Sequence, residues 1–333
     1  MQIAIIGAGL SGLTCARALQ ARGHQVTVYE KSRGVSGRIS TRRTEFGGFD
    51  HGAQYFTVTT KKFRQEADRW IKGGWVAPWL GKLVALQDGH VTAASKSSNA
   101  KSRYVGVPGM RAIGEHLAQG IDVRAEQRVE TIERLGKQWI VKVHADTVPI
   151  AATAGPFDAV VVAVPADQAA SLLSPDPAQA EQAHAARLAP CWTLMLAFQQ
   201  SLELGFDGAW VTGSRLGWIA QDASKPGRRP GEHWVCNATA AWSVEHLEDD
   251  AERARDKLVK AFHQATNTQM QPVYAAVHRW RYAQAAQPLV GDCLWNSDLQ
   301  LGACGDWFAA GLAGAGRIEN AYLSGAALAK LID

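Results

Sequence analysis

The sequence predicts an α/β protein in which segments of a helix-covered parallel sheet alternate along the chain with segments of a mostly antiparallel sheet. Three observations predict this class. A strand–turn–helix–strand unit with a glycine-rich turn opens the chain, and a strand, a second glycine-rich turn and a helix lie near its other end. Between them lies a series of short apolar segments with one long amphipathic helix. The 333 residues suffice for about two domains of ordinary size.

The opening unit has the order and spacing of a dinucleotide-binding βαβ motif. Residues 3–6 (IAII) form a continuous apolar run, which is typical of a strand buried on both faces. The pattern G-A-G-L-S-G follows at 7–12, and apolar residues at helical spacing continue to Gly23. A second strand at 25–30 ends in Glu30, about 20 residues after the glycines. We therefore expect an adenine dinucleotide on this unit.

Each residue type in this motif has a physical role. Gly7 permits the tight turn, Gly9 lets a pyrophosphate approach the backbone, and Gly12 lets the helix pack on the strand. The free N–H groups at the start of the helix attract phosphates. The carboxylate at the end of the second strand can accept hydrogen bonds from a ribose diol. The sequence thus predicts a Rossmann-type domain with cofactor contacts at Gly7, Gly9, Ser11, Gly12 and Glu30.

The segment after Glu30 indicates which dinucleotide is bound. Residues 31–38 (KSRGVSGR) supply a lysine, two arginines and two glycines. An NAD dehydrogenase has no general need for such a segment, whereas the pyrophosphate of an extended FAD needs a second cationic clamp. We therefore expect FAD, with further contacts from Lys31, Arg33, Gly37 and Arg38.

This segment resembles the Gly-Gly-Arg motif of the flavin-dependent amine oxidase superfamily, with Ser36 in place of the first glycine. Within that superfamily, the chain resembles the bacterial renalase family. The resemblance rests on stretches that occur in the same order along essentially the whole chain: 31–38, GAQYF at 52–56, GM at 109–110, SKPGR at 224–228, HRW at 278–280 and GDW at 305–307.

The resemblance implies a p-hydroxybenzoate hydroxylase-like fold that holds FAD noncovalently. It implies that Asp306, at the carboxyl end of a strand at 299–304, hydrogen-bonds the ribityl chain. It also implies that the final helix, which starts at Arg317 and Ile318, faces the N1–C2=O edge of the flavin, where its N-terminus would stabilise negative charge. The remaining implied cofactor contacts are Ala53, Gln54, Tyr55 and the backbone near Val129.

We expect two domains built from alternating segments of the chain. Residues 1–60, 100–165 and 285–333 are assigned to the FAD-binding domain, and residues 61–99 and 166–284 to the substrate domain. The first domain is expected to contain a helix at 109–118, a small meander of strands at 121–125, 129–134 and 139–144, a parallel strand at 157–165 and a helix at 317–332. The second is expected to contain strands at 191–198, 209–211, 216–220, 233–241 and 273–282, and a helix with apolar positions from Leu247 to Phe262.

The resemblance implies an oxidase of isomeric dihydronicotinamides, the 2-dihydro and 6-dihydro forms of NAD(P). A hydride would pass from the substrate to flavin N5, and dioxygen would reoxidise the flavin and form hydrogen peroxide. The sequence shows no nucleophile–base constellation, so no catalytic residue is assigned. A flat substrate favours an aromatic slot. The candidates for its lining are Tyr55, Trp192, Trp218, Trp242, Trp280 and Trp307, with polar contacts from Asn237 and Arg279.

Two other interpretations stay open. A true amine oxidase of the same fold would need a pocket for a neutral amine and a lysine that holds a water near N5. Lys225 lies in an expected loop and Lys260 on an expected helix, so neither is identified as that lysine. A non-enzymatic, nucleotide-binding redox sensor would need neither the second cationic clamp nor the final glycine-rich helix start.

Composition and charge exclude several other classes. The net charge of +4 is small and scattered, too little for a nucleic-acid partner. No apolar run approaches the ~18 residues of a membrane span, and no signal peptide is recognised, so we expect a cytoplasmic protein without a membrane partner. The five cysteines never form C-x-x-C, so neither a metal site nor a disulfide framework is expected. The expected partners are a dihydronicotinamide nucleotide and dioxygen, and the oligomeric state stays open.

Overall fold

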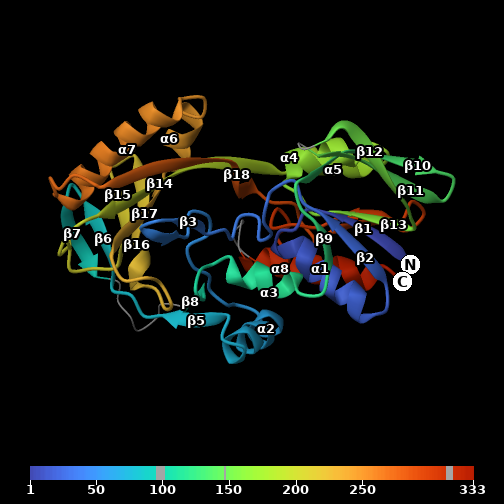
Figure 1. Cartoon of the computed structure of the whole chain (residues 1–333), viewed down its shortest axis with the longest axis horizontal. Coiled ribbons are helices and arrows are strands. Elements are labelled where there is room, and N and C mark those ends of the chain that lie inside the picture. The colour runs from blue at the N-terminus through green and yellow to red at the C-terminus, as the bar shows by residue number, and fades with distance from the viewer. Residues whose placement is uncertain (95–101, 146–147, 313–317) are drawn as a thin grey trace. The chain divides into compact units, whose positions relative to one another are not determined.

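The computed structural model describes residues 1–94, 102–145, 148–312 and 318–333 (Figure 1). The chain divides into two compact units. Unit 1 comprises Met1–Ile39, Ile113–Leu188 and Gln284–Asp333, and unit 2 comprises Ser40–Ala112 and Ala189–Ala283. Each unit is therefore assembled from segments that are far apart in the sequence.

Unit 1 is built around a six-stranded sheet in the order β19–β20–β13–β1–β2–β9 (Figure 1). Its strands are β1 (Gln2–Ile6), β2 (Gln25–Tyr29), β9 (Asp122–Arg124), β13 (Ala159–Val162), β19 (Leu294–Asn296) and β20 (Leu301–Ala303). Neighbouring strands are parallel except β19, which is antiparallel to β20. The four side chains of β13 are completely buried, as the apolar sequence AVVV requires.

Helices α1 (Leu10–Ala21) and α8 (Ile318–Leu331) pack against each other in unit 1. The approach is close because Gly325 has no side chain; a Cβ there would lie 2.2 Å from the carbonyl oxygen of Ser11. Since α1 begins directly after the glycine turn, its N-terminal N–H groups lie at the carboxyl end of β1.

An antiparallel three-stranded sheet shares a core with the large sheet of unit 1. It consists of β10 (Gln127–Leu135), β11 (Gln138–Ala145) and β12 (Val148–Phe157). The core includes the fully buried Trp139 together with Val160 and Leu301. Two helices, α4 (Ala166–Leu172) and α5 (Pro177–Ala185), contribute alanine and leucine side chains to it.

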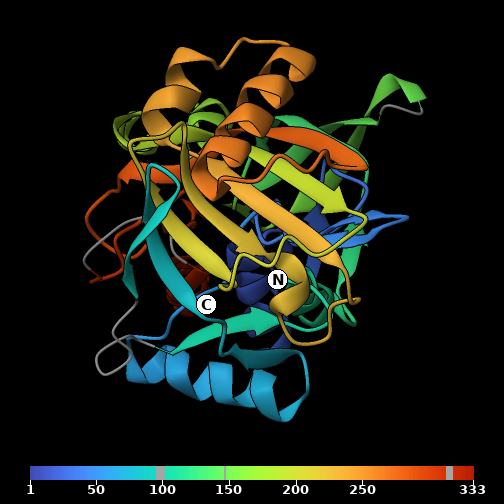
Figure 2. The same ribbon diagram turned by 90° about the vertical axis from the view of Figure 1, so that its left-hand side faces the viewer.

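Unit 2 is built around a seven-stranded sheet in the order β18–β14–β17–β16–β15–β6–β7. Its strands are β6 (Leu83–Gln87), β7 (His90–Ala94), β14 (Arg187–Phe198), β15 (Gly208–Thr212), β16 (Leu216–Gln221), β17 (Glu232–Ala238) and β18 (Tyr274–Gln287). The pair β15–β6 is parallel, whereas β14–β17, β16–β17, β15–β16 and β6–β7 are antiparallel. Figure 2 shows this sheet with α7 (Ala251–Thr266) over it, where Leu258 and Phe262 share a core with Trp234.

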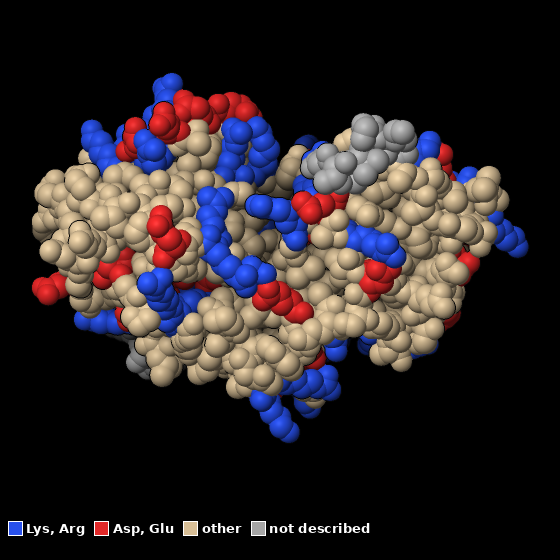
Figure 3. All heavy atoms as spheres, in the orientation of Figure 1, with Lys and Arg blue, Asp and Glu red and all other residues tan. Residues whose placement is uncertain are grey.

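The smaller elements of the chain complete the two units. They are β3 (Arg42–Thr44), β4 (Gly47–Phe49), α2 (Lys61–Lys72), β5 (Val76–Trp79), β8 (Arg103–Gly106), α3 (Ala112–Ala118), the 3-10 turn Asp222–Ser224 and α6 (Ala240–Glu245). Acidic and basic side chains lie side by side on the surface at α7 (Figure 3). Lys257 of α7 forms an ion pair with Asp249, which precedes the helix. Among the helices of the described ranges, none is long and apolar enough to cross a membrane.

The predicted fold class is confirmed, but two expected elements differ and one observed strand was not expected. The segment 121–125, expected in the meander, forms β9 and pairs in parallel with β2 in the large sheet. The third strand of the small sheet is instead β12, which the sequence analysis did not predict. The strand expected at 233–241 ends at Ala238, because Thr239 caps α6 by accepting a hydrogen bond from the N–H of Trp242.

The two units divide the chain differently from the expected domains at three segments. Residues 40–60 and 100–112 belong to unit 2, because Phe49 packs with Met195 and Val235 and because β8 pairs with β5. Residues 166–188 belong to unit 1, because α4 and α5 help to build its core.

Candidate functional site

The glycines of the turn between β1 and α1 are required by the space around them. A Cβ on Gly7, whose φ is +108°, would lie 2.6 Å from the carbonyl oxygen of Ala163. A Cβ on Gly12 would lie 2.1 Å from the carbonyl oxygen of Gly7. In contrast, among the described residues other than Gly9 and its two chain neighbours, no heavy atom lies within 4 Å of the Cβ position of Gly9. Gly7 and Gly12 therefore allow close backbone packing, and Gly9 leaves open space beside the helix N-terminus.

Glu30 ties this turn to the segment that follows β2. It is 8% exposed; Oε2 accepts a hydrogen bond from the N–H of Ala8 (2.9 Å) and Oε1 accepts one from the N–H of Ser32 (2.8 Å). Each carboxylate oxygen keeps a further lone pair, so both can still accept a hydrogen bond from a ligand hydroxyl. The residue thus has a structural role in addition to the ribose contact expected of it.

The segment 31–38 returns to the glycine turn. The N–H of Ser36 donates to the carbonyl oxygen of Ala8 at 2.9 Å, and a Cβ on Gly37 would lie 3.2 Å from the Cα of Gly9. Ser36 has a φ of +95° and Gly37 a φ of +53°. The positive φ of Ser36 explains why the motif that it resembles has glycine at this position. Lys31 and Arg33 are exposed.

The strain at Ser36 can be measured by comparing two substitutions. Ser36→Ala removes only the hydroxyl, whereas Ser36→Gly also removes the Cβ. We expect the glycine variant to be more stable than the alanine variant by about 1 kcal/mol, because glycine adopts a positive φ without steric cost. Chemical denaturation of both variants measures this difference. Equal free energies of unfolding would show that the backbone of Ser36 carries no strain.

Arg38 and Asp306 form an ion pair, although 268 positions separate them in the sequence. Arg38 Nη2 lies 2.5 Å from Asp306 Oδ1, and the side chains are 27% and 11% exposed. Asp306 follows β20, where the N–H of Gly305 donates to Ser324 Oγ at 3.0 Å. The cation expected to clamp a pyrophosphate and the carboxylate expected to hold a ribityl chain are thus brought together at the edge of one sheet.

The other expected cofactor residues of unit 1 occupy different environments. Ser11 Oγ donates to the thiol of Cys304 at 3.0 Å, so its hydroxyl is engaged within the protein. Val129, on β10, and Ile318, at the start of α8, are each 8% exposed. Arg317 lies outside the described residues.

In unit 2, a chain of hydrogen bonds joins four polar side chains. Trp218 Nε1 donates to Gln54 Oε1 (3.2 Å), Gln54 Nε2 donates to Asn237 Oδ1 (2.6 Å), and Asn237 Nδ2 donates to Thr193 Oγ1 (2.9 Å). Asn237 is the register partner of both Thr193 and Trp218 on adjacent strands. The orientation of both side-chain amides is therefore fixed.

An aromatic group surrounds the Trp218 end of this chain. The ring centroid of Tyr55 lies 5.6 Å from that of Trp218 and 5.9 Å from that of Trp79. The centroid of Trp210 lies 5.1 Å from that of Trp218. Tyr55 and Trp218 are partly exposed, and Trp210 is 37% exposed. We call Tyr55, Trp79, Trp210 and Trp218 the aromatic group; it offers flat apolar faces at the surface of unit 2.

Trp280 belongs to a separate cluster of rings. It stacks on His51 with a centroid distance of 5.3 Å, and its Nε1 donates to the carbonyl oxygen of His51 at 2.8 Å. His278 lies against both rings, and its Nδ1 is 3.3 Å from Arg42 Nη2. Burial, followed by the charge of Arg42, lowers the pKa of His278 to about 4. Burial and the neighbouring His278 and Arg42 also lower the pKa of His51 to about 4.

The lowered pKa values of His51 and His278 predict that the protein loses stability in mild acid. In the unfolded chain their pKa is 6.5, so between pH 6.5 and about 4 the unfolded state binds more protons than the folded state. The free energy of unfolding therefore decreases as the pH falls through this range, by about 3 kcal/mol for His51 alone. Thermal melting at a series of pH values measures this effect. A His51→Gln variant with the same pH dependence as the wild type would contradict the assignment.

Trp192 and Arg279, two further candidates, lie apart from the aromatic group. Arg279 Cζ lies 5.3 Å from the Trp192 ring centroid, and its Nη1 donates to the carbonyl oxygen of Leu247 at 2.6 Å. Trp192 is 3% exposed and belongs to the core beneath α7. Trp242 is part of the same core, and the fully buried Trp307 is part of the core of unit 1. The side chains of Trp192, Trp242 and Trp307 therefore fill the cores of their units.

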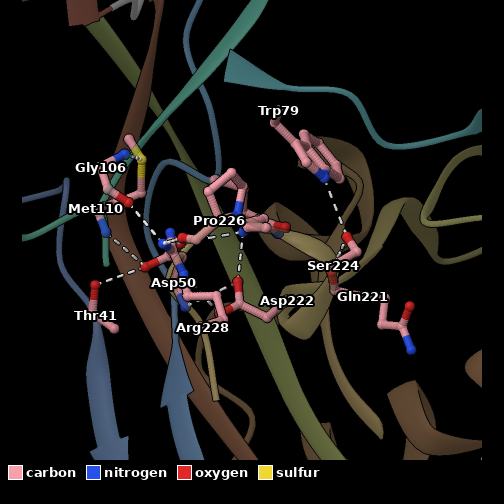
Figure 4. Close-up of polar contacts among 12 residues, drawn as sticks. Thr41, Asp50, Trp79, Gly106, Met110, Gln221, Asp222, Ser224, Pro226 and Arg228 are labelled. Carbon is pink, nitrogen blue, oxygen red and sulfur yellow. Dashed lines mark hydrogen bonds and ion pairs between the residues drawn. The ribbon is translucent and has the colours of Figure 1, made fainter. Parts of the chain in front are cut away.

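A buried ionic cluster in unit 2, which was not predicted from the sequence, is formed by Asp50, Asp222, Lys225 and Arg228. Figure 4 labels Asp50, Asp222 and Arg228. Lys225 Nζ lies 3.3 Å from Asp50 Oδ2 and 2.5 Å from Asp222 Oδ1. Arg228 Nη2 lies 2.5 Å from Asp50 Oδ2. The four side chains are 0–3% exposed, and their formal charges cancel.

The ionic cluster also joins three segments of the chain. Asp50 Oδ1 accepts hydrogen bonds from Thr41 Oγ1 (2.7 Å) and from the N–H of Met110 (2.9 Å), as Figure 4 shows. Arg228 Nη1 donates to the carbonyl oxygen of Gly106 at 2.7 Å. Asp50 and Arg228 thereby hold the region before Gln54, the turn at 106–110 and the SKPGR stretch together.

The charges in the cluster set its protonation. Burial alone would raise the pKa of Asp50, but Lys225 and Arg228 outweigh burial and keep that pKa below its ordinary value. Burial, followed by the nearby charge of Asp50, raises the pKa of Asp222. In the part of the chain that the structure describes, no group of three His, Cys, Asp or Glu side chains is placed to hold a metal ion.

Solved structures of other proteins resemble this chain over its whole length. A protein from Exiguobacterium sp. 255-15 named as a protoporphyrinogen oxidase matches with a TM-score of 0.76 at 12% identity, covering 99% of this chain and 98% of that one. Putrescine oxidase with bound putrescine matches with a TM-score of 0.70 at 14% identity, covering 100% and 99%. Identities this low show the fold alone.

The chain has local sequence relatives and matches two families. The 4,4'-diapophytoene desaturase of Staphylococcus haemolyticus is 48% identical over 52 residues, which are 16% of this chain and 10% of that protein. The NAD(P)-binding Rossmann-like domain family matches residues 5–70. The family of flavin containing amine oxidoreductases matches residues 79–333, well over half of the chain. The chain therefore belongs to the flavin-containing amine oxidoreductases, a family whose membership implies a flavin cofactor.

Proposed function

We propose that the protein is an FAD-dependent oxidase that converts isomeric dihydronicotinamides, the 2-dihydro and 6-dihydro forms of NAD(P), to NAD(P)+, as bacterial renalases do. The observation that carries this proposal is the aromatic group beside two fixed side-chain amides, Gln54 and Asn237. A dihydronicotinamide is a flat ring that carries a carboxamide. It can stack on aromatic faces and exchange hydrogen bonds with amides.

The residues around the glycine turn fit a noncovalently bound FAD. Gly9 leaves space beside the N-terminal N–H groups of α1, which favour a pyrophosphate. Glu30 keeps free lone pairs for ribose hydroxyls, and Arg38 supplies a cation in the same unit. Cys304 is fully buried and accepts a hydrogen bond from Ser11, so it is not placed to form a thioether.

When bound, the flavin supplies the redox chemistry: it takes two electrons from the substrate and passes them to dioxygen, which is reduced to hydrogen peroxide. The residues of the chain bind and orient the reactants. Gln54 is held by Trp218 and Asn237, so its remaining N–H and lone pair point in fixed directions. His51 and His278 are neutral at pH 7 because their pKa values are lowered, and no side chain has to remove a proton from carbon.

A small amine is the second candidate substrate, because the fold matches that of putrescine oxidase. Two observations favour the dihydronicotinamide. Lys225 is 2% exposed and its ammonium group is held by Asp50 and Asp222, so it is not free to hold a water beside a cofactor. A cation, Arg103, lies against the aromatic group and would repel a protonated amine.

The test is an anaerobic absorbance titration of the flavin-loaded protein with a mixture of dihydro-NAD isomers. We expect the flavin absorbance to bleach rapidly and to recover in air with formation of hydrogen peroxide. A flavin that stays oxidised with the dihydronicotinamides but bleaches with a small amine would support the second candidate. Release of free FAD on denaturation would support noncovalent binding.

A further inference from the structure

Arg103 is held between two aromatic rings in unit 2. Its Cζ lies 5.6 Å from the ring centroid of Tyr55 and 5.4 Å from that of Trp210. It lies on β8 directly opposite Trp79 of β5 in the antiparallel register. Rings of the aromatic group thus flank a guanidinium, an arrangement that favours the cation and fixes its position.

No carboxylate or carbonyl group pairs with Arg103 among the described residues, and its Nε is buried without a hydrogen-bond partner. A guanidinium that is partly removed from water and has no counter-ion is energetically unfavourable, and cation–π contacts offset only part of this cost. Arg64 shows the ordinary arrangement: it lies 5.2 Å from the ring centroid of Tyr104 and also 3.8 Å from Asp68.

Within the described part of the chain, the ionic cluster does not compensate the charge of Arg103. The ionic cluster contains two carboxylates and two cations, so it adds no net negative charge. Lys225, a member of the ionic cluster, places its ammonium nitrogen 5.9 Å from the ring centroid of Trp79. The electrostatic potential at the aromatic group therefore favours an anion.

We propose that Arg103 binds the phosphate groups of a nicotinamide nucleotide, while the aromatic group holds the guanidinium in place. This inference rests on the proposed function, which supplies the nucleotide, and it assigns a residue that selects phosphorylated substrates. A guanidinium suits this role because it can donate two parallel hydrogen bonds to one phosphate. The aromatic rings suit it because they fix the side chain before the ligand arrives, so little conformational entropy is lost on binding.

Binding can be tested without catalysis by calorimetric titration of the flavin-loaded protein. The ligands are nicotinamide riboside, nicotinamide mononucleotide and NAD+, which carry no, one and two phosphates. We expect wild-type affinity to increase with phosphate content and Arg103→Ala to lose about 10–100-fold in affinity for the two nucleotides, the range of a charge-assisted contact. The affinity of Arg103→Ala for the riboside should stay unchanged, and Arg103→Lys should be intermediate because lysine does not donate in parallel.

Arg64→Ala is the matched control, since it also removes an arginine from an aromatic face and should leave all three affinities unchanged. Equal losses of affinity for the riboside and the nucleotides in Arg103→Ala would mean that Arg103 only supports the fold, and would overturn the proposal. Wild-type affinities that do not depend on phosphate would overturn it as well.

Steady-state kinetics separates this proposal from the proposed function. With dihydronicotinamide mononucleotide as substrate, Arg103→Ala should raise KM by about 10–100-fold and leave kcat within about twofold, because ground-state binding is lost. With the dihydro riboside, both constants should match the wild type. If the wild type oxidises no dihydronicotinamide yet binds NAD+ through Arg103, the proposed reaction fails and the phosphate site stands. If turnover is observed without selectivity for phosphate, the reaction stands and the site fails.

Discussion

Lys225→Met is expected to destabilise unit 2 by about 3–5 kcal/mol, the range measured when one partner of a buried ion pair is removed. The substitution leaves the carboxylates of Asp50 and Asp222, whose side chains are 0–1% exposed, with only Arg228 of the ionic cluster to balance their charge. Coulomb repulsion between the carboxylates is then poorly screened, because water does not reach them. Chemical denaturation followed by tryptophan fluorescence measures the loss.

Two further variants separate the ionic effect from the loss of packing. Lys225→Met/Asp222→Asn removes one charge of each sign, so it should be less destabilised than Lys225→Met alone. Lys257→Met removes a partly exposed lysine from its pair with Asp249 at 2.8 Å and should cost less than about 1 kcal/mol. A Lys225→Met protein as stable as Lys257→Met would mean that the ionic cluster does not stabilise unit 2.

The glycine turn could be predicted from the sequence because its requirements are local. Gly7 and Gly12 meet backbone or side-chain atoms at the positions that a Cβ would occupy, and those contacts arise within the β1–α1 unit and its neighbouring strand. A pattern of six residues between a strand and a helix therefore carries the information. The departure of Ser36 from the Gly-Gly-Arg motif could be recognised in the sequence because this requirement is also local. The motif has glycine at the position where the backbone adopts a positive φ.

The candidate residues of the seven-stranded sheet were harder to select, because strand residues alternate between two faces. Thr193, Asn237 and Trp218 face one another across three adjacent strands and join the hydrogen-bond chain. Trp192 precedes Thr193 by one position, so its side chain points to the opposite face and fills the core beneath α7. A composition rich in tryptophan shows neither the register of the strands nor the face that each ring occupies.

The ionic cluster could not be predicted because Asp50 joins Asp222, Lys225 and Arg228 only in the tertiary structure. Asp50 and Lys225 are 175 positions apart, and Lys225 lies in a stretch whose proline and glycine are typical of an exposed loop. A charged residue in such a stretch is normally solvated, and the burial of Lys225 depends on the carboxylate of the distant Asp50 as well as on that of the nearby Asp222. The same reasoning applies to Arg103, whose unusual feature is the absence of an acidic partner in the described structure.

Arg38→Ala is expected to weaken FAD binding by about 10–100-fold, because it removes a charge-assisted contact to an anionic ligand. It also leaves the carboxylate of Asp306, whose side chain is 11% exposed, without the guanidinium that lies 2.5 Å away, and an unpaired carboxylate opposes a pyrophosphate. Flavin fluorescence during titration of the flavin-free protein with FAD measures the affinity.

The double variant Arg38→Ala/Asp306→Asn separates the effect of the lost cation from the effect of the unpaired carboxylate. If the unpaired carboxylate accounts for part of the loss in affinity, the double variant binds FAD more tightly than Arg38→Ala. If Asp306 contributes only its own contact with the cofactor, the double variant binds FAD more weakly than Arg38→Ala. Arg22→Ala is the control, because Arg22 follows the last turn of α1, at the end remote from the glycine turn, and its loss should leave FAD affinity unchanged. An Arg38→Ala protein with wild-type affinity for FAD would contradict the clamp, because this variant removes the cation and leaves the glycine turn and Glu30 intact.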